Sequence, residues 1–246
     1  MLLRIGGAIV CEEGVDSLTF GRVFRRLEAE TSVRITNGSV IGRVWENQAD
    51  FRADVLVAVA LEKNEIEVEQ TVSSVSPALA DIDLSSVESR ERAMRELCRL
   101  GGAANLQVMR EGGNWPLWVG AWQLALSQEN PDYQKRIQTA LVEGQDAFNE
   151  KIEEVYLAVA DALGYRLRTP LTLRQFTVAA DALGQGIGLR DQFDSRHMDC
   201  IWLPTGPEGE MQEWTLFAIG FDCLVRRFFE IDPDWRPQGQ EPQSQR

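Results

Sequence analysis

Residues 14–56 read GVDSLTFGRVFRRLEAETSVRITNGSVIGRVWENQADFRADVL, and this stretch decides the expected fold. Its apolar residues recur at helical spacing in two short segments, separated by a polar link and the turn-forming triplet Asn37-Gly38-Ser39. Ser17 or Thr19 is suited to cap the first helix, and Ser39 the second. The stretch therefore predicts a short amphipathic helix, a turn and a second short helix over residues 39–45, an arrangement with which many proteins read duplex DNA.

Helical periodicity continues on both sides of this stretch. We expect a helix over residues 3–13 that ends at Gly14, and a long helix from Asn47 to about residue 76, stopped by Pro77. Further helices are expected after the capping-box pattern 85–88 up to the glycine pair 101–102, from Pro116 onward, and over residues 131–163, 172–193 and 210–230. Because no alternating segments joined by hairpin turns stand out, the predicted fold class is all-α.

The glycine and proline residues that separate the expected helices also predict the domain organisation. Residues 1–56 form an expected three-helix helix-turn-helix domain, and residues 57–232 a larger helical domain. Residues 233–246 are rich in proline and glutamine and are expected to be a disordered tail.

Charge is distributed unevenly along the chain. The 246 residues carry 25 basic and 38 acidic side chains, a net charge of −13, with 44% hydrophobic content. Residues 1–53 contain as many arginines as acids, so the remainder carries the whole negative charge. This distribution argues against a protein that coats nucleic acid by bulk electrostatics, but it permits a neutral, arginine-bearing head to approach DNA first.

The chain offers few residues for catalysis or for holding a metal. Its four cysteines show no metal-ligand spacing, and His197 is the single histidine. A hydrolytic triad, a structural metal and a cofactor are therefore not expected, and we predict a protein that is not an enzyme. No apolar run is long enough to span a bilayer and no leader segment is apparent, so we expect a reduced, cytoplasmic chain without membrane contact.

The ordered motifs of the head resemble the amino-terminal domain of TetR-family transcriptional regulators. The matching elements are Glu13-Gly14, Leu18-Thr19, Gly38-Ser39-Val40 and the apolar-polar run that ends at Leu56. Residues 176–190, FTVAADALGQGIGLR, look like the penultimate helix of that family. The chain departs from the family in having Ile41 where a tyrosine is usual, and in its longer link over residues 28–37.

The resemblance implies a DNA-binding transcriptional regulator, most often a repressor, that binds a near-palindromic operator as a homodimer. At the tip of a recognition helix, small and polar side chains can approach phosphates while Arg43 reaches a guanine edge. The expected DNA-binding residues are Thr19, Arg22, Arg34, Thr36, Asn37, Ser39, Val40, Arg43 and Trp45. The alternative for Arg22, Arg25 and Arg26 is the solvated face of a helix.

The larger domain carries two further sets of candidate residues, each with a structural alternative. A stripe of tryptophans is either a core seam or the wall of a cavity for a small apolar inducer, with candidate lining residues Met109, Trp115, Trp118, Trp122 and Phe148. The resemblance implies that the last two helices pair with their copies in a second subunit, through Ala180, Leu183, Ile187, Phe217, Phe221 and Leu224. These same residues could equally form core within one chain.

Two other classes of function remain open from the sequence. A small-molecule helical enzyme would need a polar constellation in the larger domain, and none is found. A helical module that binds protein partners through its acidic surface would show no salt-dependent affinity for DNA.

Overall fold

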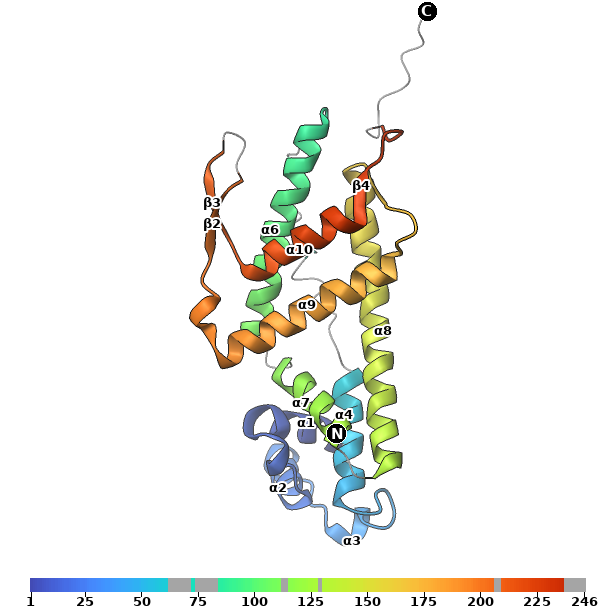
Figure 1. The fold of residues 1–246 in the computed structure, drawn as a ribbon. Helices are drawn as coiled ribbons and strands as arrows, with labels where there is room; N and C mark the ends of the chain where they lie inside the picture. The colour runs from blue at the N-terminus through green and yellow to red at the C-terminus, as the bar shows by residue number, and fades with distance from the viewer. Residues whose placement is uncertain (62–71, 74–83, 112–114, 128–129, 206–208, 237–246) are drawn as a thin grey trace, which may run out of the picture. The chain divides into compact units, whose positions relative to one another are not determined.

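The computed structural model describes residues 1–61, 72–73, 84–111, 115–127, 130–205 and 209–236, and most of them are helical (Figure 1). The chain divides into two compact units. The first comprises Met1–Asn64 and Gly112–Phe148, and the second comprises Glu65–Glu111 and Asn149–Arg246. The first unit thus contains residues 112–148 in addition to the head that the sequence suggests.

The first unit is built mainly from helices. Their bounds are α1 Leu2–Glu13, the 3-10 helix η1 Val15–Ser17, α2 Phe20–Thr31, α3 Asn37–Val40, α4 Gln48–Leu61, α7 Trp115–Ser127 and the first part of α8, which spans Pro131–Ala162. The Thr19 side chain accepts the backbone N–H of Arg22 and so caps α2. The Asn47 carboxamide accepts the N–H groups of Ala49 and Asp50 and so caps α4. The first cap confirms the sequence prediction, and the second lies at the residue where the sequence predicted that a helix begins.

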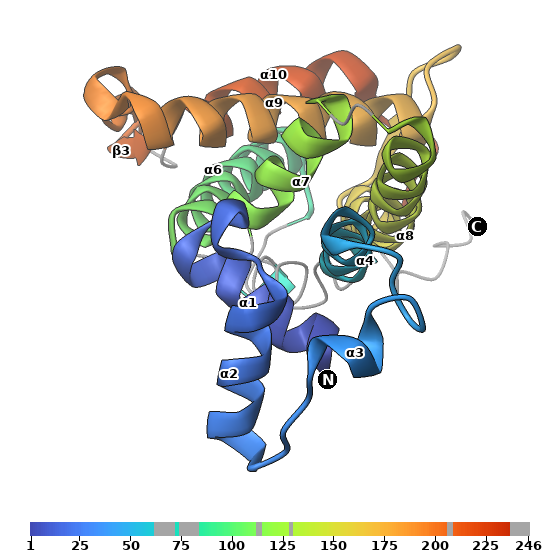
Figure 2. The ribbon, with the colours of Figure 1, turned by 90° about the horizontal axis from the view of Figure 1, so that it is seen from below.

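The apolar faces of α1, α2 and α4 contribute to one core. Figure 2 shows the course of these three helices. Four aromatic rings close this core next to α3. Phe20 stacks on Phe51 with 4.7 Å between ring centroids, Trp45 meets Phe51 edge-on at 4.7 Å, and Phe24 lies 5.6 Å from Phe20. Rings in such arrangements add stability beyond the area they bury, so the segment after α3 is fixed to α2 and α4.

A second core lies where α4, α7 and α8 meet. It contains Ala53, Leu56, Ala60, Trp118, Ala121, Ala125, Ile137, Ala140 and Leu141. The small residues on α4 and α8 let these helices approach closely, since Gly144 of α8 lies directly against the backbone of Ala60. Helix α4 therefore packs in two directions, against the amino-terminal helices and against α8.

The second unit combines long helices with two small antiparallel sheets. Its described elements are α6 Val87–Glu111, the rest of α8, β1 Tyr165–Leu167, α9 Leu173–Phe193, the 3-10 helix η2 Ser195–His197, β2 Ile201–Pro204, β3 Met211–Trp214, α10 Leu216–Phe228 and β4 Phe229–Ile231. β1 pairs with β4 through the register Arg166 to Glu230, and β2 pairs with β3 through Trp202 to Glu213. Helices α9 and α10 lie side by side (Figure 1).

Helix α6 continues through the glycine pair that was expected to end it. A Cβ atom on Gly102 would lie 2.6 Å from the Cα atom of Ala218, so the glycine allows α6 and α10 to cross in contact. Tertiary packing here outweighs the low helix propensity of glycine. The start of α6 also differs by one residue, because the hydroxyl of Ser86, not Ser85, accepts the backbone N–H of Ser89.

The all-α prediction holds for most of the described residues and is wrong at the strands. Residues 211–214 form β3 instead of the first turn of a helix, and the Thr215 side chain caps α10 by accepting the N–H of Ala218. The helix expected over residues 172–193 is confirmed as α9, and Thr172 and Gln175 form a reciprocal capping box at its start.

The carboxyl-terminal tail is described only up to residue 236. Within that part the indole N–H of Trp235 donates to the backbone oxygen of Asp161 at 2.7 Å. Residues 237–246, the rest of the expected disordered tail, lie outside the described residues. Of the helices that the structure describes, none has the length and apolarity that a membrane span requires.

Candidate DNA-binding surface

The segment after α3 is a tight turn, not the helix over residues 39–45 that the sequence suggested. The backbone oxygen of Val40 accepts the N–H groups of Arg43, Val44 and Trp45, and the N–H of Gly42 donates to the oxygen of Trp45 at 2.8 Å. Gly42 has a φ of 75°, a conformation that glycine adopts without strain and that interrupts a helix. We call residues 41–47 the recognition turn.

The recognition turn separates exposed side chains from buried ones. Val44 is 62% exposed and Arg43 is also exposed, whereas Trp45 and Val40 are only 5% and 7% exposed. Burial among Phe20 and Phe51 gives Trp45 a place in the core, and Val40 belongs to the same cluster. Their burial argues against Val40 and Trp45 as DNA contacts, so both are removed from the candidate residues.

Ion pairs divide the arginines of the head into two groups. Arg22 pairs with Glu13, Arg26 with Glu12 and Glu30, and Arg4 with Glu30, while Arg52 donates to the backbone oxygen of Leu18. The hydrogen bond from Arg26 lowers the pKa of both Glu12 and Glu30. Arg22 is thus held by a carboxylate of α1, although it was expected to anchor the DNA backbone.

The other group of arginines is exposed and has no ion pair within the part of the chain that the structure describes. Its members are Arg25, Arg34 and Arg43, on α2, in the link after α2 and in the recognition turn. A cation without a carboxylate partner gives up no ion pair when it meets a phosphate, so these side chains suit DNA contact. Arg34 and Arg43 are among the DNA-binding residues predicted from the sequence. Arg25 is not among them, and the solvated face of its helix was the alternative that the sequence left open for it.

The remaining candidate contacts are small polar residues near α3. Thr36 is exposed, and Thr19 is half-buried with its hydroxyl engaged in the cap of α2. Asn37 and Ser39 lie on α3, but their side chains are outside the described part of the structure.

Two carboxylates of α4 link the recognition turn to α8. Asp54 accepts the indole N–H of Trp45 at 2.7 Å, and Asp50 accepts the backbone N–H of Glu46 at 2.9 Å. Arg136 of α8 donates to both carboxylates, at 2.7 Å to Asp50. Burial disfavours ionisation of Asp50, but the hydrogen bonds from Arg136 and from the Glu46 N–H outweigh it and lower the pKa of this carboxyl.

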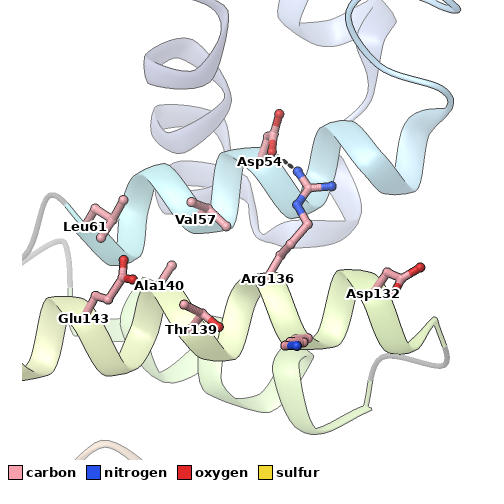
Figure 3. Close-up of a pocket in the computed structure, with 9 residues that line it drawn as sticks. Asp54, Val57, Leu61, Asp132, Arg136, Thr139, Ala140 and Glu143 are labelled. Atoms are coloured by element: carbon pink, nitrogen blue, oxygen red, sulfur yellow. Dashed lines mark hydrogen bonds and ion pairs between the residues drawn. The ribbon is translucent and has the colours of Figure 1, made fainter.

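A shallow groove of about 490 Å³ runs between α4 and α8 beside these contacts (Figure 3). Its lining mixes apolar groups with charges of both signs, and comprises Asp54, Val57, Leu61, Asp132, Lys135, Arg136, Thr139, Ala140 and Glu143. None of the residues expected to line an inducer cavity borders this groove.

The tryptophan stripe packs in the core of the first unit. Trp115 and Trp118 are 6% and 5% exposed, and Trp118 meets Trp122 edge-on at 5.6 Å in the cluster with α4 and α8. This supports the core-seam alternative for these residues. Phe148 is half-buried at the end of the first unit, while Met109 belongs to the second, where its side chain lies beside Gly184 of α9.

The six residues expected at a dimer interface pack largely within one chain. Ala180 and Phe217 are buried, and Leu183, Ile187, Phe221 and Leu224 are half-buried. Leu183 lies against Gly220, and Phe221 lies 5.6 Å from Phe176 in the core between α9 and α10. The intrachain alternative that the sequence left open is therefore the better account of these side chains.

Comparison with known proteins adds no assignment for this site: no family model matches the chain, and no curated protein matches it.

Proposed function

We propose that the chain is a TetR-like, DNA-binding transcriptional regulator, most often a repressor in that family, and that it binds a near-palindromic operator as a homodimer. The observation that carries the proposal is the division of the arginines in the head. Arg25, Arg34 and Arg43, which lie in α2, in the link after it and in the turn after α3, are exposed and have no ion pair among the described residues, while Arg4, Arg22, Arg26 and Arg52 are held by partners in the protein. Such a surface offers cations to phosphates and base edges without first breaking ion pairs.

Arg43 has the best position to read a base. It lies in a turn fixed by hydrogen bonds to Val40 and by the buried Trp45, so its backbone is held while its side chain is exposed. A guanidinium in such a setting can donate two hydrogen bonds to a guanine edge. A two-fold dimer would place two such turns in successive major grooves, roughly 34 Å apart.

The proposal is tested by fluorescence anisotropy with duplex from the region upstream of the protein's own gene, against scrambled duplex at several salt concentrations. Arg43→Ala is expected to lower affinity by about 5- to 150-fold, the effect of ~1–3 kcal/mol for a base contact. Arg4→Ala is the charge-matched control, because Arg4 already pairs with Glu30. With Arg25 and Arg34 of each of two subunits at phosphates, the slope of log affinity against log salt should be about −4.

Equal affinity for both duplexes, or equal losses in Arg43→Ala and Arg4→Ala, contradicts the proposal. The first result favours the alternative of a helical protein-interaction module, since that class predicts no selective, salt-dependent DNA affinity.

Self-association is proposed through the exposed face of α9. Val178, Ala182, Gly186, Leu189 and Phe193 follow one another at helical spacing and are all exposed. An apolar stripe that faces solvent marks an interaction surface, and helix pairing between two copies would cover it. Leu189→Glu should shift sedimentation toward the monomer, whereas Leu157→Glu, at a comparably exposed leucine of α8, should not.

A further inference from the structure

Two carboxylates of α4 each bridge the recognition turn to the same arginine of α8. One oxygen of Asp50 accepts the backbone N–H of Glu46 at 2.9 Å, and its other oxygen accepts Arg136 at 2.7 Å. Asp54 repeats the pattern: one oxygen accepts the indole of Trp45 at 2.7 Å and the other accepts Arg136 (Figure 3). Every carboxylate oxygen in this network has a donor, with the turn on one side and α8 on the other.

A second contact joins the same elements one turn earlier on α8. The hydroxyl of Tyr133 accepts a hydrogen bond from the Asn47 side chain at 3.2 Å. Asn47 in turn caps α4 through the N–H groups of Ala49 and Asp50. The Arg136 guanidinium also lies 5.8 Å from the Tyr133 ring. Helix α8 therefore contacts both the carboxyl-terminal end of the recognition turn and the residues that begin α4.

The network is partly shielded from solvent. The Asp50 side chain is only 14% exposed, compared with 34% for Asp54 and 40% for Arg136. A guanidinium that donates to two fixed carboxylates restrains the positions of all three side chains more strongly than a single exposed ion pair does. Loss of Arg136 would leave two adjacent carboxylates facing each other, and their repulsion would loosen their bonds to Trp45 and Glu46.

We propose that Arg136 is a positioning residue for DNA binding: through Asp50 and Asp54 it fixes the recognition turn and thereby the direction in which Arg43 is presented. The inference rests on the proposed function, because it assigns Arg136 a role in DNA affinity. It also makes α8, and not only the amino-terminal helices, a determinant of that affinity. Helix α8 continues to Ala162, within the residues of the second unit, so the same helix belongs to both units.

Arg136→Met removes both bonds and retains the length of the side chain. Lys135→Met is the matched control, because it removes the same charge from the neighbouring position of α8, where Lys135 is exposed and has no ion pair among the described residues. We expect Arg136→Met to weaken binding to the duplex from the upstream region by about 2- to 30-fold, the range for mutations that act through a contact network. Lys135→Met should change it by less than about twofold.

A readout that does not depend on DNA separates positioning from general stability. The Trp45 indole N–H, assigned in a ¹⁵N spectrum with Trp45→Phe, reports directly on the bond to Asp54. Its resonance should move in Arg136→Met, move less in Arg136→Lys, which keeps a charge for one carboxylate, and stay in place in Lys135→Met. The Lys variant also supplies the measurement if the Met variant does not fold.

An unmoved indole resonance in a folded Arg136 variant overturns the inference, as does an affinity loss no larger than that of Lys135→Met. Absence of selective binding by the unmodified protein overturns the proposed function, and with it the role of Arg136 in DNA affinity. The indole measurement still decides in that case whether Arg136 holds the recognition turn, so the two failures are distinguishable.

Discussion

A single methyl group on Gly144 tests how closely α8 packs on α4. In Gly144→Ala the new Cβ would clash with the carbonyl oxygen of Ala60 and lie 3.2 Å from its carbonyl carbon. Since ordinary contacts between carbon and oxygen are about 3.3–3.6 Å, one helix must move by roughly an ångström. Overpacking of this kind costs ~1–3 kcal/mol, and the better helix propensity of alanine offsets up to about 1 kcal/mol. We expect a net destabilisation of about 1–2 kcal/mol.

Thermal unfolding followed by circular dichroism measures this effect. For a chain of this length, about 1–2 kcal/mol corresponds to a decrease in Tm of roughly 2–8 °C. Gly21→Ala is the matched control, because Gly21 lies in α2 of the same unit, is exposed, and has no atom within 4 Å of an added Cβ. That substitution should raise the Tm. If Gly144→Ala raises it equally, the helices do not approach as closely as the argument requires.

Three further outcomes are expected. The pKa of Asp50 is lowered from its ordinary 3.8, so its ionised form stabilises the fold above about pH 4, and this stabilisation is lost as the pH falls through the lowered pKa. Below pH 4 the Tm of Asp50→Asn should therefore depend less on pH than the Tm of the unmodified protein. Thr172→Ala removes the acceptor for the N–H of Gln175 and should cost about 1 kcal/mol in urea unfolding, with the amide of Gln175 exchanging faster. Burial raises the pKa of the Cys98 thiol, so Ellman's reagent should react with Cys98 only after denaturation. In the folded protein the reagent should modify the exposed cysteines, which are Cys11, Cys200 and Cys223. Rapid reaction of Cys98 in the folded protein would contradict its burial.

Local sequence signals predicted the elements well where both the stabilising contact and its cause are local. The caps at Thr19, Asn47 and Thr172 involve partners within three residues, so the pattern contains all the information needed. Helical spacing likewise puts Phe20, Val23, Phe24 and Leu27 on one face, and these are the buried residues of α2. Such features depend on the chain over one or two turns and not on the rest of the fold.

Features that depend on distant residues were not accessible in this way. Nothing near Arg22 in the helical pattern shows that Glu13 will pair with it, and nothing near Trp45 shows that Asp54 will accept its indole. The strands of residues 201–204 and 211–214 were missed because they are only four residues long and stabilise each other only by pairing. Gly102 was read as a helix end because its partner, Ala218, lies more than one hundred positions away.

The net charge of −13 opposes DNA binding only if all the acidic side chains together repel an approaching phosphate. At physiological salt, charges separated by more than about 8 Å are largely screened, so the face that meets a phosphate responds to nearby charges. In the first unit five carboxylates form ion pairs with arginines of the same chain, and they belong to Glu12, Glu13, Glu30, Asp50 and Asp54. An acid that already has a cation at hydrogen-bond distance repels a phosphate less than a free acid, whereas Arg25, Arg34 and Arg43 keep their full attraction. Within residues 1–53 the exposed arginines Arg25, Arg34 and Arg43 and the acids Asp16, Glu28 and Glu46 have no ion pair among the described residues. Attraction for a phosphate therefore depends on where these six charges lie, and not on a basic composition.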